Sequence, residues 1–431
     1  MMPDQGAVSV DIEAWRARIR RDVEINYLFH MGQAIGRLNG DTASAVSRLT
    51  ACLALEPGHL GALDALIRTL EAAGATAEAE EWRQRAEARI PGFAVEAALF
   101  RADALAVDRA FDAAAEQLGL ARSLGADARR CAEFEARLLH DQGVLARQAG
   151  RLDDALTFLD RAMRLRPDWI ALARLHAQVL QDFGRDGEAL AAWRVLLAQW
   201  PDDSDANLQA GQLLYQQGQL AGALPYLERA AQGLWRNASV SNLLGLTLLG
   251  LNRPKEAIPV LRSAVAFGST DDIHRHLALA LLGTGNAAEA VEQLTEANRI
   301  FGPDPARSAV LALAKLTLGR RQEAAAAIDA NRRHSDPAPL TATVSGLIAL
   351  PDELGPAALD RWRAMAQRYR FPTIHIILAG LLARAGDLVG ARHEAETAAG
   401  MPWFGLNRRM LPDVGGLRSY WDPLLPPSPD D

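Results

Sequence analysis

Apolar and polar positions follow a helical period along most of this chain, and the whole pattern recurs about every 34 residues. Each repeat holds two amphipathic stretches separated by a short turn. In the representative repeat 134–167, the pattern predicts a first helix over 134–149, a turn at 150–153 and a second helix over 154–166. Pro167 ends that second helix, because proline lacks an N–H and crowds the preceding turn.

Three positions keep a fixed phase in each repeat: a small residue in the first helix, a turn residue, and an alanine in the second helix. The alanines lie 33 or 34 residues apart, at Ala155, Ala189, Ala223, Ala257, Ala290, Ala324, Ala358 and Ala391. The turn residue stands five positions earlier, as Gly150, Gly184, Gly218, Asn252, Gly285, Gly319 and Gly386. A period of this length is typical of stacked helix pairs, so the sequence predicts an all-α solenoid and not a set of globular cores.

The phase is looser toward both ends and defines the expected domain organisation. We expect an N-terminal capping helix within 1–25, divergent repeats over 26–126, regular repeats over 127–403, and a C-terminal cap with a proline-rich tail over 404–431. The tail from Pro426 onward has the composition of a disordered segment. Between Ala114 and Ala155 the spacing grows to 41 residues, so a lengthened helix or a looped-out joint is expected near 125–133.

The chain resembles the tetratricopeptide repeat family over roughly residues 26–403. The resemblance rests on the pattern Gly143, Gly150, Ala155 and Ala162 and on the helix-ending prolines Pro57, Pro91, Pro167 and Pro201. It implies a right-handed superhelix of about eleven helix-turn-helix repeats, with the first helices on the concave face. It implies no particular ligand, because the family motif is architectural. The paired Lys and Asn positions of the family's chaperone-binding clamp are not reproduced, so chaperone binding is not expected.

Composition narrows the class of function. The formal net charge of −7 gives no global field to attract nucleic acid. We expect no membrane insertion, because no run approaches the roughly 20 apolar residues of a membrane span. The only cysteines are Cys52 and Cys131, which form neither a disulfide framework nor a zinc site, and Cys52 is expected to be a small buried residue. A bacterial, cytoplasmic protein is the expectation.

No catalytic, cofactor-binding or metal site is predicted, so we expect the protein not to be an enzyme. The Gly-x-Gly-x-x-Ala run at 283–288 resembles a dinucleotide loop, but it lies between two helices and has no preceding strand. His274 and His276 lie two apart on a helix and so point away from each other, which favours ordinary core or surface histidines. Paired acids such as Asp153 and Asp154 lie at helix starts, where they cap free N–H groups.

The residues expected to line the groove stand eleven and eight positions before each alanine, on one face of the first helix. The upstream repeats contribute Val144 and a polar set, and the downstream repeats contribute a run of leucines. At these positions the polar set contains Arg147, Gln178, Gln181, Gln212 and Tyr215, and it also includes Arg174 of the same upstream wall. The leucine ladder, as we call it, is Leu246, Leu249, Leu279, Leu282, Leu313, Leu316, Leu347 and Leu350.

Eight leucines left in water would make an unusually large apolar patch, because burying one leucine is worth roughly 1.5–3 kcal/mol. Four alternatives remain open for what covers these leucines: packing of neighbouring helices in a tightly curved superhelix, a helix of a protein partner, the C-terminal tail, or an apolar small molecule. For the polar set, two interpretations remain open. It forms a solvated face, or it binds a peptide, because Gln and Tyr side chains can form hydrogen bonds with a peptide backbone.

Three functional hypotheses follow. The first is a non-enzymatic scaffold that holds a partner protein or peptide in its concave groove, with self-association as a further possibility. The second is a substrate-recruiting subunit for a separately encoded protein-modifying enzyme. The third is a sensor of an apolar small molecule.

Overall fold

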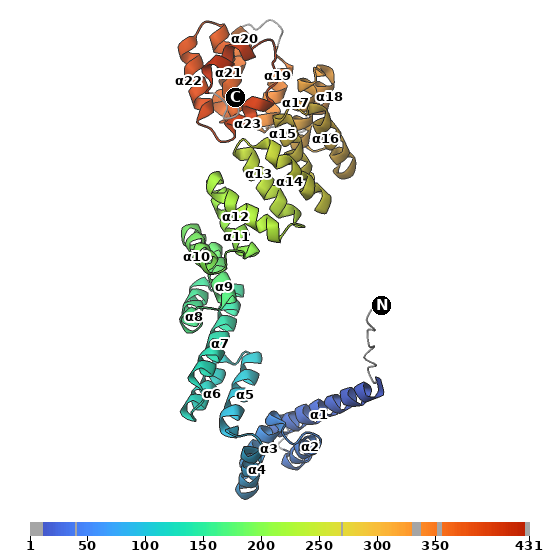
Figure 1. The fold of residues 1–431 in the computed structure, drawn as a ribbon, viewed down its shortest axis with the longest axis vertical. Coiled ribbons are helices and arrows are strands. Elements are labelled where there is room, and N and C mark those ends of the chain that lie inside the picture. The colour runs from blue at the N-terminus through green and yellow to red at the C-terminus, as the bar shows by residue number, and fades with distance from the viewer. Residues whose placement is uncertain (1–11, 39–40, 269, 330–337, 351–355, 427–431) are drawn as a thin grey trace, which may run out of the picture. The chain divides into compact units, whose positions relative to one another are not determined.

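The computed structural model describes residues 12–38, 41–268, 270–329, 338–350 and 356–426. These residues form 24 α-helices and one short 3-10 helix, with no strand among them, and Figure 1 shows their succession. The predicted all-α solenoid fold is confirmed. The described residues fall into two compact units, the first ending at Gly184 and the second beginning at Arg185.

The first unit holds nine helices. They are α1 (Ile12–Leu38), α2 (Thr42–Leu55), α3 (Leu60–Ala72), α4 (Thr76–Arg89), α5 (Phe93–Val107), α6 (Phe111–Ser123), α7 (Ala128–Gln148), α8 (Leu152–Leu165) and α9 (Ile170–Asp182). Helix α1 runs without a break across residue 25, where the sequence analysis separated a cap from the first repeat. Between Ile12 and Gly32 the helix contains no glycine or proline, so nothing in the sequence interrupts it at residue 25.

The extra residues before Ala155 lengthen a helix. Helix α7 has 21 residues, whereas α9 and α11 (Ser204–Gln216) each have 13. Of the two outcomes expected near residues 125–133, the structure therefore has the lengthened helix. Cys52 lies buried in the core of the same unit, and burial raises the pKa of its thiol to about 11.

The second unit holds the remaining helices. Its paired helices are α10 (Asp186–Gln199), α11, α12 (Leu220–Gly233), α13 (Ala238–Gly250), α14 (Pro254–Phe267), α15 (Asp271–Gly283), α16 (Ala287–Phe301), α17 (Pro305–Thr317), α18 (Arg321–Asp329), α19 (Pro339–Ile348), α20 (Pro356–Arg368), α21 (Pro372–Arg384) and α22 (Leu388–Ala399). A terminal segment adds α23 (Phe404–Met410), α24 (Arg418–Trp421) and the 3-10 helix η1 (Asp422–Leu424). Of the tail expected to be disordered from Pro426 onward, residues 427–431 lie outside the described part of the chain.

The turn between paired helices has the same backbone geometry in both units. After α7, Gly150 adopts a φ of 72°, the Gly150 N–H donates to the Arg147 carbonyl, and the Arg151 N–H donates to the Ala146 carbonyl. This is the Schellman arrangement, which satisfies the last carbonyls of a helix and requires a left-handed residue. The same φ sign occurs at Gly184, Gly218, Asn252, Gly285, Gly319 and Gly386, so the predicted turn positions are confirmed.

The paired helices approach closely because small residues face large ones. The phased alanines are buried, including Ala155 and Ala257. A Cβ placed on Gly245 of α13 would lie 2.5 Å from Cγ of Leu261 in α14. The leucine therefore occupies the volume that a side chain at the glycine would need, and this contact sets the spacing between the two helices.

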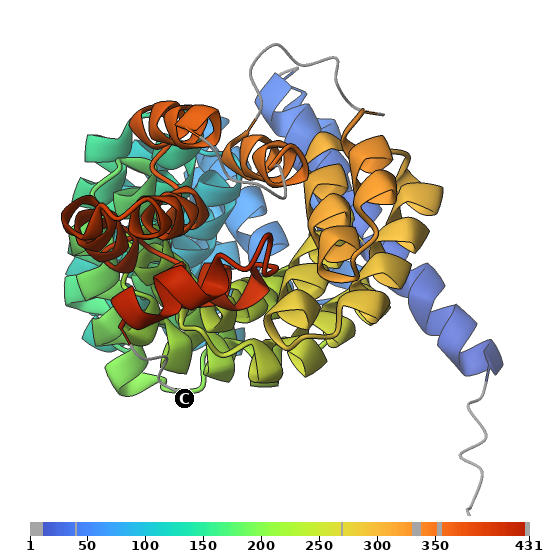
Figure 2. The same ribbon diagram turned by 90° about the horizontal axis from the view of Figure 1, so that it is seen from above.

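The terminal segment of the second unit packs in two places. Trp421 lies on α21, where its ring would contact a Cβ placed on Gly380 at 2.8 Å. Helix α23 contacts α21 and also α15, and Leu406 lies against Gly283 at the end of α15. Figure 2 shows this C-terminal segment in red beside the yellow helices of the same unit. The segment thus joins the last repeat to a much earlier one.

Candidate functional site

The polar residues predicted in the first unit form a network of paired side chains. Nε of Arg147 on α7 lies 2.5 Å from Oδ2 of Asp182, and its Nη1 donates to Oε1 of Gln178 at 3.0 Å. Gln178 and Asp182 both lie on α9, so the guanidinium bridges two first helices of successive repeats. Arg174 and Gln181 lie on α9 too and are half-buried, each with an interaction partner. Asp182 already balances the charge of Arg147, so an incoming carboxylate competes with it.

The polar residues predicted in the second unit line a cavity of about 410 Å³. Gln212 and Tyr215 on α11 meet Leu246 on α13 around a volume of 410 Å³. Its polar wall also contains Gln216 and Asn242, and its apolar wall contains Leu208, Leu243 and Ile273. We call this space the α11–α13 groove. Burial raises the pKa of Tyr215, which keeps its hydroxyl protonated and able to donate.

Asn242 and Ile273 were not among the residues predicted for this site. Asn242 lies one helical turn before Leu246 on α13, and Ile273 lies near the start of α15. The helical spacing of four between Asn242 and Leu246 is a signal that extends the selected positions by one turn. No comparable signal exists for Ile273, because it lies six residues before the selected Leu279 on the same helix, a spacing that does not place the two on one face.

The leucine ladder divides into buried and partly exposed members. Packing within the unit buries Leu249, Leu282, Leu313, Leu347 and Leu350. The partly exposed members are Leu246, Leu279 and Leu316. The first of these lines the α11–α13 groove, and the second lines a separate cavity near the terminal segment. Contact of the leucine ladder with a partner remains a prediction, and these three leucines are the most accessible members of the ladder.

His274 and His276 are both buried on α15, as expected for core histidines. Nδ1 of His276 lies 2.8 Å from Oδ1 of Asn242, so this ring supports a residue of the groove. Burial and, to a smaller extent, the nearby Arg275 lower the pKa of His276 to about 4, although Asp272 opposes the change. The imidazole is therefore neutral in the folded protein at neutral pH.

We expect the second unit to lose stability in mild acid because of His276. The unfolded chain takes up a proton on this residue near pH 6.5, whereas the folded chain does so only near pH 4. Between these values the unfolded state binds more protons, so the unfolding free energy falls as the pH falls. Denaturation should show a loss of about 1 kcal/mol from pH 7 to 5.5 at this site. His276→Gln should reduce that loss, whereas the exposed His393→Gln should leave it unchanged; equal profiles for both variants would contradict the assignment.

Metal binding and membrane crossing are the remaining possibilities for the residues that the structure describes. No group of three or more His, Cys, Asp or Glu side chains within these ranges could hold a metal ion. Within the same ranges, no helix has both the length and the apolar character needed to cross a membrane.

Comparison with known proteins places the repeat in a family. Residues 174–241 and 242–305 match the tetratricopeptide repeat family. No curated protein matches the chain. MamA from Desulfovibrio magneticus RS-1 is 22% identical, with 38% of this chain and 94% of that chain covered and a TM-score of 0.36. YrrB, described as a tetratricopeptide-repeat protein with an unusual peptide-binding site, is 20% identical, with 42% and 95% covered and a TM-score of 0.39.

The stacked helix pairs and their left-handed turn residues define an α-solenoid built from a repeating helix-turn-helix unit. The family match runs from Arg174 in α9 to the first residue of α17, and the same turn and alanine phase continues on both sides of it. The repeats over residues 174–305 are therefore tetratricopeptide repeats.

Proposed function

We propose that this protein is a non-enzymatic interaction scaffold that holds a peptide segment of a partner protein in the α11–α13 groove. The observation that carries the proposal is the composition of that groove. Gln212, Gln216 and Asn242 offer amides beside the Tyr215 hydroxyl, and Leu246 lies among them. Amides and a protonated phenol pair with a peptide backbone, and the leucine offers contact to an apolar side chain.

The same residues favour binding over catalysis. Side-chain amides do not exchange protons near neutral pH, and the raised pKa of Tyr215 makes its hydroxyl a poorer acid. The described lining of the groove also has the hydroxyls of Ser239 and Thr270 but no His, Cys, Asp, Glu or Lys that could act as their general base. Recruitment of a substrate to a separately encoded protein-modifying enzyme would use the groove in the same way.

The other predicted contact residues extend the proposal within each unit. In the first unit, the network of Arg147, Arg174, Gln178 and Gln181 would contact acidic or amide groups of a partner. In the second unit, Leu279 and Leu316 would contact apolar groups. The buried leucines hold the first helices together, and they could reach a partner only if those helices separated.

We expect Tyr215→Ala to weaken peptide binding about tenfold, since one hydrogen bond and an aromatic contact together exceed roughly 1.4 kcal/mol. Peptides are selected from a random display library on the full chain, synthesised with a fluorophore, and titrated by fluorescence polarisation. Leu246→Gln should also weaken binding. Tyr226→Ala is the matched control, because Tyr226 lies on the second helix α12 and does not line the groove. Selected peptides that bind all variants equally would place the site elsewhere, and measuring the molar mass of the free chain tests self-association in the same samples.

A further inference from the structure

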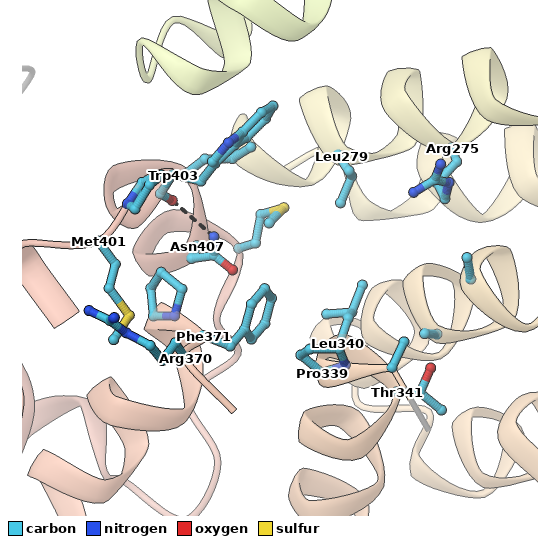
Figure 3. Close-up of a pocket in the computed structure, with 17 residues that line it drawn as sticks. Arg275, Leu279, Pro339, Leu340, Thr341, Arg370, Phe371, Met401, Trp403 and Asn407 are labelled. Atoms are coloured by element: carbon cyan, nitrogen blue, oxygen red, sulfur yellow. Dashed lines mark hydrogen bonds between the residues drawn. The ribbon is translucent and has the colours of Figure 1, made fainter. Parts of the chain in front are cut away.

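The second cavity lies between the terminal segment and the middle repeats of the second unit. It has a volume of about 480 Å³, within the range of roughly 300–1,000 Å³ usual for small-molecule sites. Figure 3 shows Trp403, Phe371 and Met401 on one side and Leu279, Leu340 and Pro339 on the other. We call this space the α15–α23 cavity, after two of the helices that enclose it.

The lining of the α15–α23 cavity is mostly apolar and adaptable. Leu279, Leu340 and Leu406 supply aliphatic surface, and Met401 and Met410 supply flexible side chains that adjust to an occupant. Asn407 does not present an unsatisfied polar group to it. Its Nδ2 donates to the Trp403 carbonyl at 2.9 Å, and its Oδ1 accepts from Thr373 Oγ1 at 2.8 Å. The interior therefore suits an apolar chain and not a polar ligand.

The charge at the edge of this cavity has one sign. Arg275 and Arg370 line it, and no Asp or Glu is present among its described lining residues. Arg275 is paired with Asp272. Arg370 is exposed and has no hydrogen-bond or ion-pair partner among the residues that the structure describes. An anionic group bound beside Arg370 would therefore neutralise a charge that is otherwise left to solvent, and a carboxylate matches the fork of the guanidinium.

Trp403 has an unusual backbone conformation beside the same cavity. It has a φ of 64°, and it lines the cavity as the residue that precedes α23. A bulky residue in the left-handed region is strained, and such residues gather at ligand clamps. The strained peptide is held by the hydrogen bond from Asn407 to the Trp403 carbonyl. Trp403 thus has a fixed position at the wall that an occupant would touch.

We propose that the α15–α23 cavity binds a medium-chain monocarboxylic acid, with its alkyl chain among Leu279, Leu406 and Met410 and its carboxylate at Arg370. This proposal is independent of the peptide groove, because the two cavities share no lining residue. A flexible alkyl chain fits an irregular aliphatic lining better than a rigid ring system does. One carboxylate suits one unpaired arginine.

The first test is a chain-length series titrated into the full chain by isothermal calorimetry. The probes are octanoate, decanoate, dodecanoate and tetradecanoate below their micelle concentrations. Each added methylene should tighten the dissociation constant about fourfold until the cavity is full, and longer chains should then gain nothing. An affinity that rises without limit would indicate adsorption to the surface and would overturn the proposal. Absence of heat for every length would overturn it too.

The second test separates the carboxylate site from general apolar binding. Arg370→Gln should weaken decanoate binding about tenfold and leave decanol binding unchanged. Arg361→Gln is the matched control, because Arg361 is exposed on the neighbouring α20 and does not line the cavity. Leu279→Gln should weaken both probes. Equal affinity of the wild-type chain for decanoate and decanol would refute the role of Arg370. Binding of a peptide with an apolar C-terminus, without any fatty acid binding, would replace the proposed ligand class.

Discussion

Gly245→Val is expected to destabilise the pair α13–α14 by about 3 kcal/mol. Even the first added carbon would lie 2.5 Å from Cγ and Cδ2 of Leu261. Leu261 is fully buried, so its side chain has no free space into which to move. The two helices must therefore separate or the valine must adopt a poor rotamer, and both outcomes lose packing.

The control for this prediction is the same substitution at Gly222. That glycine is exposed on α12, and a Cβ there would meet Leu214 only at 3.8 Å, an ordinary contact. We expect Gly222→Val to stay within about 0.5 kcal/mol of the wild type. Because repeat arrays need not unfold in one step, hydrogen exchange of the α13 and α14 amides is the appropriate measurement. Similar protection in both variants would show that the glycine does not set the helix spacing. The double variant with Leu261→Ala should recover part of the loss.

The repeat could be predicted from the sequence because its physical requirements are local. A left-handed turn residue, a small residue and a buried alanine each restrict one position, and each recurs 33 or 34 residues later. Asn252 illustrates the strength of this restriction. It replaces glycine at a turn, adopts a φ of 60°, and is one of the few side chains that tolerate that conformation.

The groove could be predicted only in part. Gln212, Tyr215 and Leu246 were selected by their spacing from the alanines, and the structure places all three around one cavity. The spacing identifies the face of each first helix, because the helical period is fixed. It does not give the distance between successive first helices, and that distance decides which leucines are buried. Leu249 and Leu246 therefore differ in exposure although both belong to the ladder.

The α15–α23 cavity could not be predicted from the repeat. Its walls come from residues more than 100 positions apart, such as Leu279 and Leu406, and the terminal segment follows no period. A C-terminal cap from residue 404 could be expected from the sequence, but nothing in the sequence indicates its contact with α15. Contacts of this kind depend on how the repeats curve, which accumulates small rotations between successive helix pairs.

Trp421→Ala is expected to cost about 3–5 kcal/mol in the last repeat, the range for removing a large aromatic side chain from a core. The Trp421 side chain is 1% exposed and lies on Gly380 of α21. Helix α21 is buried on every face, with Ile374, Ile377 and Leu381 among its buried residues. A solenoid must shield the apolar surface of its terminal repeat, and Trp421 provides much of that shield here. Its removal leaves a cavity and admits water to the helix.

Tyr420→Ala is the matched control, since Tyr420 is the preceding residue, lies on the same short helix and is 40% exposed. Its loss should change the unfolding free energy by less than about 1 kcal/mol. Hydrogen exchange over α21 and α22 distinguishes the two variants, and an increase in binding of an apolar dye should accompany Trp421→Ala alone. If the α21 amides keep their protection against hydrogen exchange in both variants, residues other than Trp421 shield the terminal repeat.

Since α23 contacts both α21 and α15, a weakened cap should also loosen the α15–α23 cavity. Decanoate binding should therefore fall in Trp421→Ala and persist in Tyr420→Ala, which links the stability of the terminal repeat to the proposed ligand site.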